Sequence, residues 1–560
     1  MRINHLSRFS LAWRAGVGQA SCLPAGRMPA SPYGRLKTGI EGGAQLCLLA
    51  LCLSGLPAHA ASPSGLRFNV SVAPHLATAL ADGRLFVILG RADDPEPRFA
   101  LEHTGPDTPP VLARDVRGFA PGAAVVVDES AFSFPITNLA ALSPGDYCVQ
   151  ALFDSNTDLR CPNAPGNLYS KPQRVRIGWT HSESVALELA EQVPAERLPA
   201  QTGLVKFVRI QSKLLSQFHG RPIFLRAGII LPRDYQRQAS RRCPLWVRIG
   251  GLNARYTAVG KLMAERSEFR RIWLAEGTPA LILLQLDGAG PYGDPYQVNS
   301  ANNGPYGDAL VQELIPFVEA NFRALAQPRG RFLSGSSTGG WVSLALQVFY
   351  PDFFNGAWSS CPDPVDFRAF ELVDIYRDDN AYVDQLGNER PSERDARGNV
   401  VLTMRREVGL ENLLGRANSF TRSGQQWGEW NAVFSPRGPD GLPMPLWGPQ
   451  TGKIDHAVAQ EWKKYDLRLV LEHNWKTLAP KLRGKLHIAA GESDQFFLNN
   501  AAHLLDEFLS RADPPFEGKL VFGPGKLHGW MDLSLREMLE AMSAAAEAKS
   551  EAPKSEGNPK

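Results

Sequence analysis

The chain has 560 residues, of which 44% are hydrophobic and 21% are charged. This length allows two or three domains with sizeable cores, and the composition argues against a wholly disordered chain or a protein with many membrane spans. The formal net charge is only +3, so no basic surplus favours nucleic acid as a partner. No CxxC or His-rich ligand spacing occurs, and we therefore expect no structural zinc site.

The first 60 residues have the pattern of a signal peptide. An apolar run at 46–56 is too short to span a bilayer, and it leads into Ala58, His59 and Ala60, which predicts cleavage after Ala60. A buried helix and an uncleaved anchor are the alternatives. Without residues 1–60, 54 basic and 56 acidic residues remain. We expect an exported protein, periplasmic or secreted, with no nucleic-acid partner and no membrane contact after cleavage.

Four cysteines follow the leader, and an oxidising compartment allows them to form disulfides. Cys148 and Cys161 flank a short segment, 149–160, that could be a hairpin, so we expect a bridge between these two residues. Cys243 and Cys361 are either a second pair or two buried thiols, and both interpretations stay open.

Short β-type runs dominate residues 61–180. The runs at 66–72 and 84–89 alternate with stretches rich in Pro, Gly and Asp. This pattern is typical of a small all-β sandwich. We therefore expect an N-terminal all-β domain over this range.

A linker is predicted over 181–203. It contains a helical-looking stretch at 183–191, followed by Pro194 and Pro199, which are typical of a connection between domains. At the other end of the chain, residues 547–560 are polar and rich in Ala, Pro and Lys, and we expect this tail to be disordered.

Strands and helices alternate over 204–546, which predicts an α/β domain with a mostly parallel, doubly wound sheet. The alternation lapses over 362–482, a segment that contains Trp427, Trp430 and Trp447. A connection of this length is usually an inserted structure, often a lid or a wall. The predicted strands are 204–210, 223–231, 245–249, 280–286, 331–333, 356–359, 485–489 and 519–522, and the predicted helices are 308–324, 339–350, 499–511 and 532–546.

The pentapeptide at 335–339, Gly-Ser-Ser-Thr-Gly, matches the nucleophile pattern G-x-S-x-G. In this pattern the serine lies on a tight turn between a strand and a helix, where a side chain at either glycine would crowd the backbone. The pattern alone is weak because Gly and Ser are common. An apolar strand precedes it and an amphipathic helix follows it, and we therefore predict that Ser337 is a nucleophile.

A nucleophilic serine requires a base and a carboxylate that orients the base. Asp494 follows the predicted strand 485–489, and His528 follows the strand 519–522. These positions give the order Ser, acid, His along the chain, with acid and base each after a strand. We predict a triad of Ser337, Asp494 and His528. The alternatives are Glu492 as the acid and His456 or His473 as the base.

The tetrahedral intermediate requires hydrogen-bond donors for its oxyanion. We expect one from the backbone N–H of Thr338, directly after the nucleophile. The second is expected from Gly251 or Leu252, in the loop after the strand 245–249, where two glycines permit a close backbone approach. A plain turn explains these glycines almost as well.

These segments resemble the putative-esterase family of the esterase D, feruloyl esterase and mycolyltransferase group. The resemblance rests on 214–222, 227–232 and 312–319, together with the Ser337, Asp494 and His528 segments, and it covers about 204–546. It implies an α/β-hydrolase fold and an acyl-ester hydrolase or acyltransferase that uses neither metal nor organic cofactor. The family usually has His-Gly after its third strand, where this chain has Ile249 and Gly250.

The main hypothesis is an exported serine esterase that acts on a small-molecule or glycan-linked ester. An acyltransferase with the same acyl-enzyme is one alternative, and a non-catalytic protein that binds glycan or peptide is another. Three tyrosines, Tyr292, Tyr296 and Tyr306, lie in the loop after the strand 280–286 and could stack on an aromatic or sugar group, and of these Tyr292 and Tyr306, with Trp530 beside the predicted base, are the candidate substrate-binding residues. The tyrosines could equally be turn residues that pack on one another. Neither the ester nor the oligomeric state follows from the sequence.

Overall fold

The computed structural model describes residues 65–548, except 77–80, 92, 94, 103, 104, 106 and 181. The predicted signal peptide at 1–60 and nearly all of the predicted tail lie outside the described residues. Among the helices of the described part, none has the length and apolar character needed to cross a bilayer.

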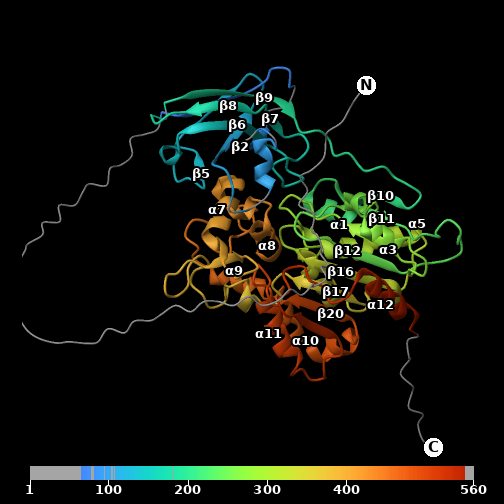
Figure 1. Ribbon diagram of the computed structural model, residues 1–560. Coiled ribbons are helices and arrows are strands. Elements are labelled where there is room, and N and C mark those ends of the chain that lie inside the picture. Colours follow the sequence, from blue (N-terminus) through green and yellow to red (C-terminus); the bar gives the residue numbers. More distant parts are fainter. Residues whose placement is uncertain are drawn as a thin grey trace, which may run out of the picture. The chain divides into compact units, whose positions relative to one another are not determined.

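Nine strands in the first part of the described chain form one hydrogen-bonded sheet (Figure 1). They are β1 (Arg67–Val72), β2 (Ala81–Gly90), β3 (Val111–Phe119), β4 (Ala124–Val127), β5 (Phe132–Phe134), β6 (Gly145–Asp154), β7 (Leu168–Ser170), β8 (Gln173–Ile177) and β9 (Ser184–Gln192). Their order is β4-β1-β9-β7-β6-β2-β3-β5, with β8 also paired to β6. Alternate side chains of β1, β2, β6 and β9 share one core. This all-β region is thus one continuous hydrogen-bonded sheet with its own apolar core.

Two expectations for this region are wrong. The stretch 183–191, predicted as a helix in a linker, is strand β9, because Val185, Leu187 and Leu189 alternate with exposed residues and fill the sheet core. The predicted disulfide is absent, since Cys148 and Cys161 are both free thiols. The chain does not turn back after Cys148 but continues as β6 to Asp154, a run of roughly 20 Å.

The second sheet has eight strands in the order β10-β11-β13-β12-β16-β17-β20-β21. They are β10 (Val205–Ser212), β11 (Ile223–Ile230), β12 (Leu245–Ile249), β13 (Ile282–Leu286), β16 (Arg331–Ser337), β17 (Ala357–Pro362), β20 (Leu486–Gly491) and β21 (Lys519–Gly523). The first two strands are antiparallel to their neighbours, and the other six are parallel. All eight predicted strands are present, with ends that differ by up to four residues.

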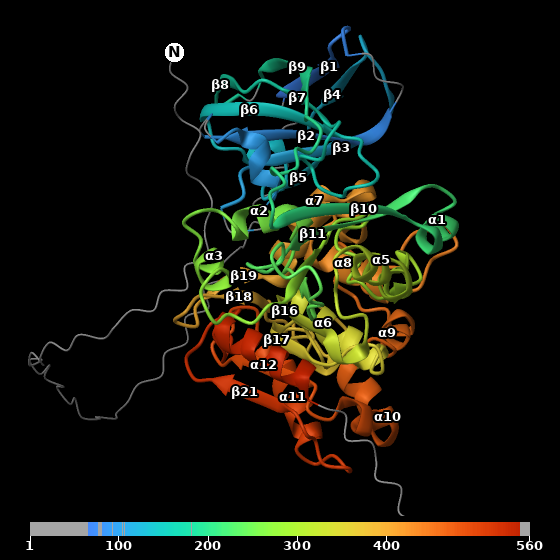
Figure 2. The ribbon, with the colours of Figure 1, turned by 90° about the vertical axis from the view of Figure 1, so that its right-hand side faces the viewer.

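Helices cover both faces of this sheet (Figure 2). One face packs on α2 (Val259–Leu262), α3 (Glu268–Trp273) and α12 (Leu535–Glu547). The other face packs on α5 (Ile315–Asn321), α6 (Thr338–Phe349), α10 (Leu467–Leu482) and α11 (Asn499–Leu509). The predicted helix 308–324 consists of α4 (Tyr306–Ala309), a π-turn at Leu310–Leu314 and α5.

The segment between β17 and β20 carries its own elements, as expected for an insertion. A hairpin of β18 (Pro391–Arg394) and β19 (Val400–Thr403) is followed by α7 (Met404–Leu414), α8 (Gln426–Phe434) and α9 (His456–Trp462). The three tryptophans at 427, 430 and 447 are at most 2% exposed. Trp427 packs against the other two, and Phe370 packs against Trp427 and Trp430. They form the core of the insertion rather than an exposed platform.

Candidate active site

Ser337 lies at the junction of β16 and α6, on a backbone with φ 59° and ψ −125°. This left-handed conformation is strained for a residue with a side chain, and such strain is common at functional sites. The flanking glycines make the turn possible: a Cβ on Gly335 would lie 2.3 Å from the backbone of Gly339, and one on Gly339 would lie 2.4 Å from the carbonyl oxygen of Ile249. The turn therefore has the geometry of a nucleophile elbow.

Asp494 and His528 lie in the loops that follow β20 and β21. His528 Nδ1 and Asp494 Oδ2 are 2.8 Å apart, and their side chains are only 8% and 1% exposed. The His528 backbone N–H donates to Gln495 Oε1 at 2.7 Å. This bond fixes the loop that carries His528 against the loop that carries Asp494. A buried carboxylate in this position holds an imidazole in one orientation.

The alternative acid and bases lie elsewhere. Glu492 Oε2 is 3.1 Å from His503 Nε2, so that carboxylate has a different histidine as its partner. His456 is 3.8 Å from Asp379 at the surface. His473 is exposed on α10.

A further carboxylate, Asp363, contacts the candidate nucleophile. The Ser337 hydroxyl donates to Asp363 Oδ1 at 3.2 Å, and Asp363 is 2% exposed. Asp363 was not among the site residues predicted from the sequence. It follows β17, the strand next to the elbow, by one position, and the rule that selected Asp494 and His528, a polar residue after a parallel strand, would have found it.

Four other donors surround Asp363, all directed at Oδ2. The Tyr296 hydroxyl lies at 2.6 Å, Trp430 Nε1 at 3.1 Å, and Gln426 Nε2 and Thr338 Oγ1 both at 3.3 Å. Trp430 and Gln426 belong to α8. The insertion therefore forms one wall of the site and reaches the residue that contacts Ser337.

Buried acids give this wall an unusual electrostatic character. Burial raises the pKa of Asp363, although its hydrogen bonds and nearby His528 act in the opposite direction. Burial also raises the pKa of Asp294 to about 7 and that of Glu429 well above its ordinary range. Asp294 and Glu429 adjoin each other, since the Asp294 N–H donates to Glu429 Oε1 at 2.7 Å. The buried surroundings of these three carboxyl groups therefore have a low dielectric, which favours the neutral form of each group.

The predicted oxyanion donors lie next to the elbow. Thr338 is the first residue of α6 and is fully buried. A Cβ on Gly251 would lie 3.7 Å from Ser337 Cβ and 3.6 Å from the carbonyl oxygen of Ser336. The loop that holds Gly251 and Leu252 therefore approaches the nucleophile closely, as an oxyanion loop must.

The candidate substrate residues lie in three different settings. Tyr306 is 7% exposed and belongs to the sheet core, where burial raises its pKa to about 12. Tyr292 lines a cavity together with Arg422. The Trp530 carbonyl accepts a hydrogen bond from Ser360 Oγ at 2.8 Å. Of the tyrosines in this loop, Tyr296 is the one that contacts Asp363.

One trio of potential metal ligands exists among the described residues. The ligand atoms of Cys361, Asp494 and His528 lie within 4.8 Å of one another. Burial raises the pKa of the Cys361 thiol to about 11, whereas a metal requires the thiolate. Asp494 and His528 already form a hydrogen bond with each other.

Together, the mixed sheet, the elbow and the buried acid–base pair define an α/β-hydrolase. The comparison with protein families then gives the family: the one described as "Putative esterase" matches residues 225–516, which is more than half of the chain. The chain belongs to this esterase family and is a carboxylic ester hydrolase. No curated protein matches it significantly.

Solved structures of esterases are similar to this chain at low identity. A ferulic acid esterase is 11% identical, with a TM-score of 0.33 and coverage of 61% of this chain and 97% of its own. The S-formylglutathione hydrolase from Agrobacterium tumefaciens is 14% identical, with a TM-score of 0.33 and coverage of 61% and 94%. A fluorophosphonate-binding serine hydrolase from Staphylococcus aureus is 16% identical, with a TM-score of 0.35 and coverage of 61% and 98%. Because the scores are below 0.5, the assignment rests on the family match.

Proposed function

We propose that this protein hydrolyses a carboxylic ester through an acyl-enzyme on Ser337, with His528 as the base and Asp494 as the orienting acid. The observation that carries the proposal is the strained elbow at Ser337 combined with the buried pair of His528 Nδ1 and Asp494 Oδ2, 2.8 Å apart. A serine hydroxyl is a weak nucleophile, and an adjacent oriented imidazole is the usual means of activating it.

The reaction begins when Ser337 Oγ attacks the carbonyl carbon of the ester. His528 takes the hydroxyl proton at Nε2 and returns it to the alcohol that leaves. The N–H groups of Thr338 and of Gly251 or Leu252 donate to the oxyanion. Water, activated by His528, then attacks the acyl-enzyme and releases the acid, which regenerates the serine.

Asp363 adds one step to this sequence. In the structure the Ser337 hydroxyl donates to Asp363, so the hydroxyl turns from Asp363 towards His528 before it loses its proton. The Asp363 carboxyl group interacts electrostatically with His528 and favours the imidazolium that forms there. Asp363 thus acts on both partners of the proton transfer.

The substrate is a small-molecule or glycan-linked ester, and the protein is exported to the periplasm or the medium. The export proposal is supported by the apolar run at 46–56 and by Ala58 and Ala60. Mass spectrometry of the protein recovered from its compartment tests it. A mature chain that begins at Ala61 supports export, and an intact leader contradicts it.

A panel of p-nitrophenyl and feruloyl esters of graded length tests the hydrolase proposal. Wild type is expected to release the acid and to accumulate an acyl adduct on the peptide that contains Ser337. Ser337→Ala is expected to lose hydrolysis and adduct together. Hydrolysis that persists in Ser337→Ala would overturn the proposal, and transfer of the acyl group to an added alcohol in preference to water would replace it with an acyltransferase.

A further inference from the structure

A cavity of about 170 Å³ lies at the meeting point of three segments that are far apart in the sequence. Arg160 comes from the loop after β6, Tyr292 from the loop after β13, and Arg416 and Arg422 from the insertion. We call this cavity the arginine pocket. It is several times larger than the volume of about 30 Å³ that one water molecule occupies, so it has room for part of an organic molecule.

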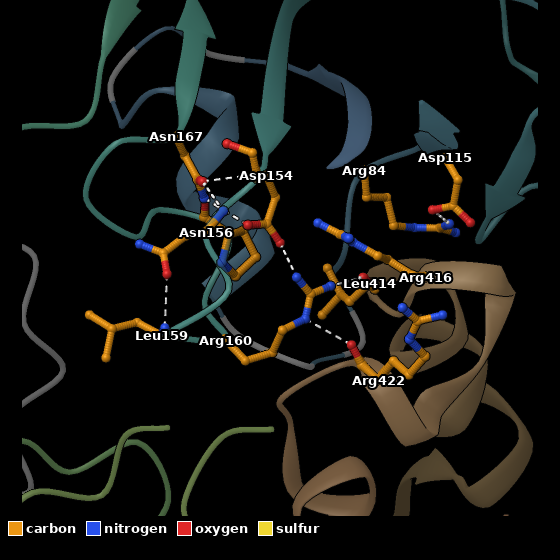
Figure 3. A network of polar contacts seen from close by, with 12 residues as sticks. Arg84, Asp115, Asp154, Asn156, Leu159, Arg160, Asn167, Leu414, Arg416 and Arg422 are labelled. Carbon is orange, nitrogen blue, oxygen red and sulfur yellow. Dashed lines mark hydrogen bonds and ion pairs between the residues drawn. The ribbon is translucent and has the colours of Figure 1, made fainter. Parts of the chain in front are cut away.

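Arg160 is held by fixed partners on one side of the pocket (Figure 3). It forms an ion pair with the buried Asp154, and its Nε and Nη2 donate to the carbonyl oxygens of Arg422 and Leu414 at 2.8 and 3.0 Å. Outside the pocket lining, the buried Arg84 pairs with Asp115 at 2.8 Å. Two aspartates therefore neutralise these two arginines, and Arg160 is a fixed part of the pocket lining.

Arg416 and Arg422 have no such neutralisation, because neither makes an ion pair within the described part of the chain. Arg416 Nη2 donates to the backbone carbonyl of Asp82 at 3.0 Å, a neutral acceptor. Burial lowers the pKa of Arg422, and the positive charges of Arg416 and Arg160 lower it further, while Asp115 has a smaller opposing effect. The pocket lining holds three arginines and no carboxylate, so like charges repel one another there.

Guanidinium groups that line a cavity without an ion-pair partner, such as those of Arg416 and Arg422, can bind an anion. Arginine presents planar N–H donors that match carboxylate, phosphate and sulfate in bidentate geometry. Burial raises the pKa of Tyr292, so its hydroxyl stays protonated and can donate. Asn156 and Thr157 add polar groups to the lining, and Pro291 and Leu442 add apolar contact, which favours an organic anion over a free ion.

We propose that the arginine pocket is a binding site for an anionic small molecule, whose carboxylate, phosphate or sulfate group lies between Arg416 and Arg422 with its carbon skeleton against Tyr292. The proposal concerns binding and does not rest on ester hydrolysis. The pocket is nonetheless connected to the candidate active site, because the loop that carries Tyr292 also carries Tyr296, whose hydroxyl donates to Asp363.

Thermal unfolding and calorimetric titration of the full chain test the proposal, both at low ionic strength, where screening is weak. The probes are glucuronate, glucose 6-phosphate, inorganic phosphate and sulfate, with glucose as the uncharged match for the sugars. At least one anion is expected to raise the unfolding temperature saturably, and glucose is expected to have no effect. A stronger effect of the sugar anions than of the free ions indicates an organic anion, and the reverse indicates a free phosphate or sulfate. The absence of a saturable response to all four anions would overturn the proposal.

Matched variants show whether the anion binds at Arg416 and Arg422. Arg422→Gln is expected to weaken the best anion about tenfold or more, because it removes a charged hydrogen-bond donor. Without anion it is expected to unfold at or above the wild-type temperature, since it relieves repulsion, and a purely structural arginine would not behave in this way. Arg416→Gln provides the same test with a second residue. Arg397→Gln, exposed in the same insertion, is the control and should bind as wild type does.

Ser337→Ala separates this proposal from the proposed esterase activity. It is expected to bind the anion with unchanged affinity, since Ser337 does not line the pocket. Equal binding in wild type and in both Arg416→Gln and Arg422→Gln would contradict the arginine pocket and leave the esterase proposal untouched.

Discussion

The Asp494 carboxylate and the Glu492 carboxylate are two residues apart, and each lies beside a different histidine. We expect Asp494→Asn to lower kcat about 10³-fold or more, because an amide at this position favours the wrong imidazole tautomer. Glu492→Gln is the matched control and should keep at least half of the wild-type activity. Steady-state kinetics with one ester measures both. A large loss in Glu492→Gln together with an active Asp494→Asn would reverse the assignment.

Asp363 accepts hydrogen bonds from five side chains, and no other residue type of its size can do so. An asparagine can direct its amide oxygen at the four donors that converge on Oδ2, but its NH₂ group then faces the Ser337 hydroxyl in place of the acceptor Oδ1. Because hydrogen bonds to a carboxylate are stronger than those to a neutral amide, Asp363→Asn is expected to lose about 1–3 kcal/mol of unfolding free energy and most of its activity.

Urea unfolding and kcat/KM measure the two effects of Asp363→Asn. Tyr296→Phe removes a single donor and is the milder companion, with an expected loss of about 1 kcal/mol. If Asp363→Asn were as stable and as active as wild type, the hydrogen-bond cluster around Asp363 would have no role in the site.

Single site residues can be predicted from the sequence where the backbone conformation restricts which residue types a position accepts. The elbow requires glycines and a serine between a strand and a helix, and this local pattern predicted Ser337. Asp494 and His528 followed from chain order. Asp363 and α8 were not predicted, because their approach to Ser337 depends on how a long insertion packs, and no local pattern encodes that packing.

Among the elements, α8 brings the insertion to the candidate active site, and Glu411 of α7 fixes its first turn. Glu411 is fully buried and accepts from the N–H groups of Trp427 and Gly428, both at 2.9 Å, and from Ser423 Oγ at 2.8 Å. Its side chain supplies acceptors to a helix start that has unpaired N–H groups. The position of Gln426 and Trp430 beside Asp363 therefore depends on Glu411.

Glu411→Ala is expected to lower the unfolding free energy by about 3 kcal/mol, since three buried donors lose their acceptor. Activity should fall with it even at temperatures where the variant is folded, because α8 shifts. Urea unfolding and kcat/KM at 15 °C separate the two effects. Glu461→Ala, which breaks an exposed ion pair on α9, is the control and should change stability by less than about 1 kcal/mol. A similarly small change in Glu411→Ala would contradict the role given to Glu411.

The strands of the second sheet could be predicted because they are apolar and are separated by turn residues, and all eight appear in the structure.

The wrong prediction at 183–191 has a specific physical origin. This segment contains glutamates and alanines, which favour helices in isolation, but Val185, Leu187 and Leu189 alternate with period two. In the folded protein β1 offers a parallel partner, and the burial of that face outweighs local propensity.

At the scale of the whole molecule, the β-sheet region and the hydrolase are joined by a buried apolar contact. Leu410, Leu413 and Leu414 of α7 pack into one cluster with residues of β2, β3 and β6. The buried Arg84 reinforces this contact by donating from Nε to the carbonyl oxygen of Leu413 at 2.7 Å. An apolar interface of this kind couples the unfolding of the two regions.

Calorimetry is expected to show one cooperative unfolding transition for the wild type. Leu413→Asp places a carboxylate in the buried contact, and we expect it to split the transition in two or to lower its midpoint by more than 5 °C. Leu386→Asp is the control, because Leu386 is 87% exposed, and it should leave the scan unchanged. Two separate transitions in the wild type would show that the contact does not couple the regions.

Covalent labelling by a fluorophosphonate, followed by peptide mapping, tests whether Ser337 is the nucleophile. We expect a single stoichiometric adduct on Ser337, no adduct in Ser337→Ala, and much slower labelling in Asp494→Asn. An adduct on another residue of the wild type, or undiminished labelling of Ser337→Ala, would contradict it.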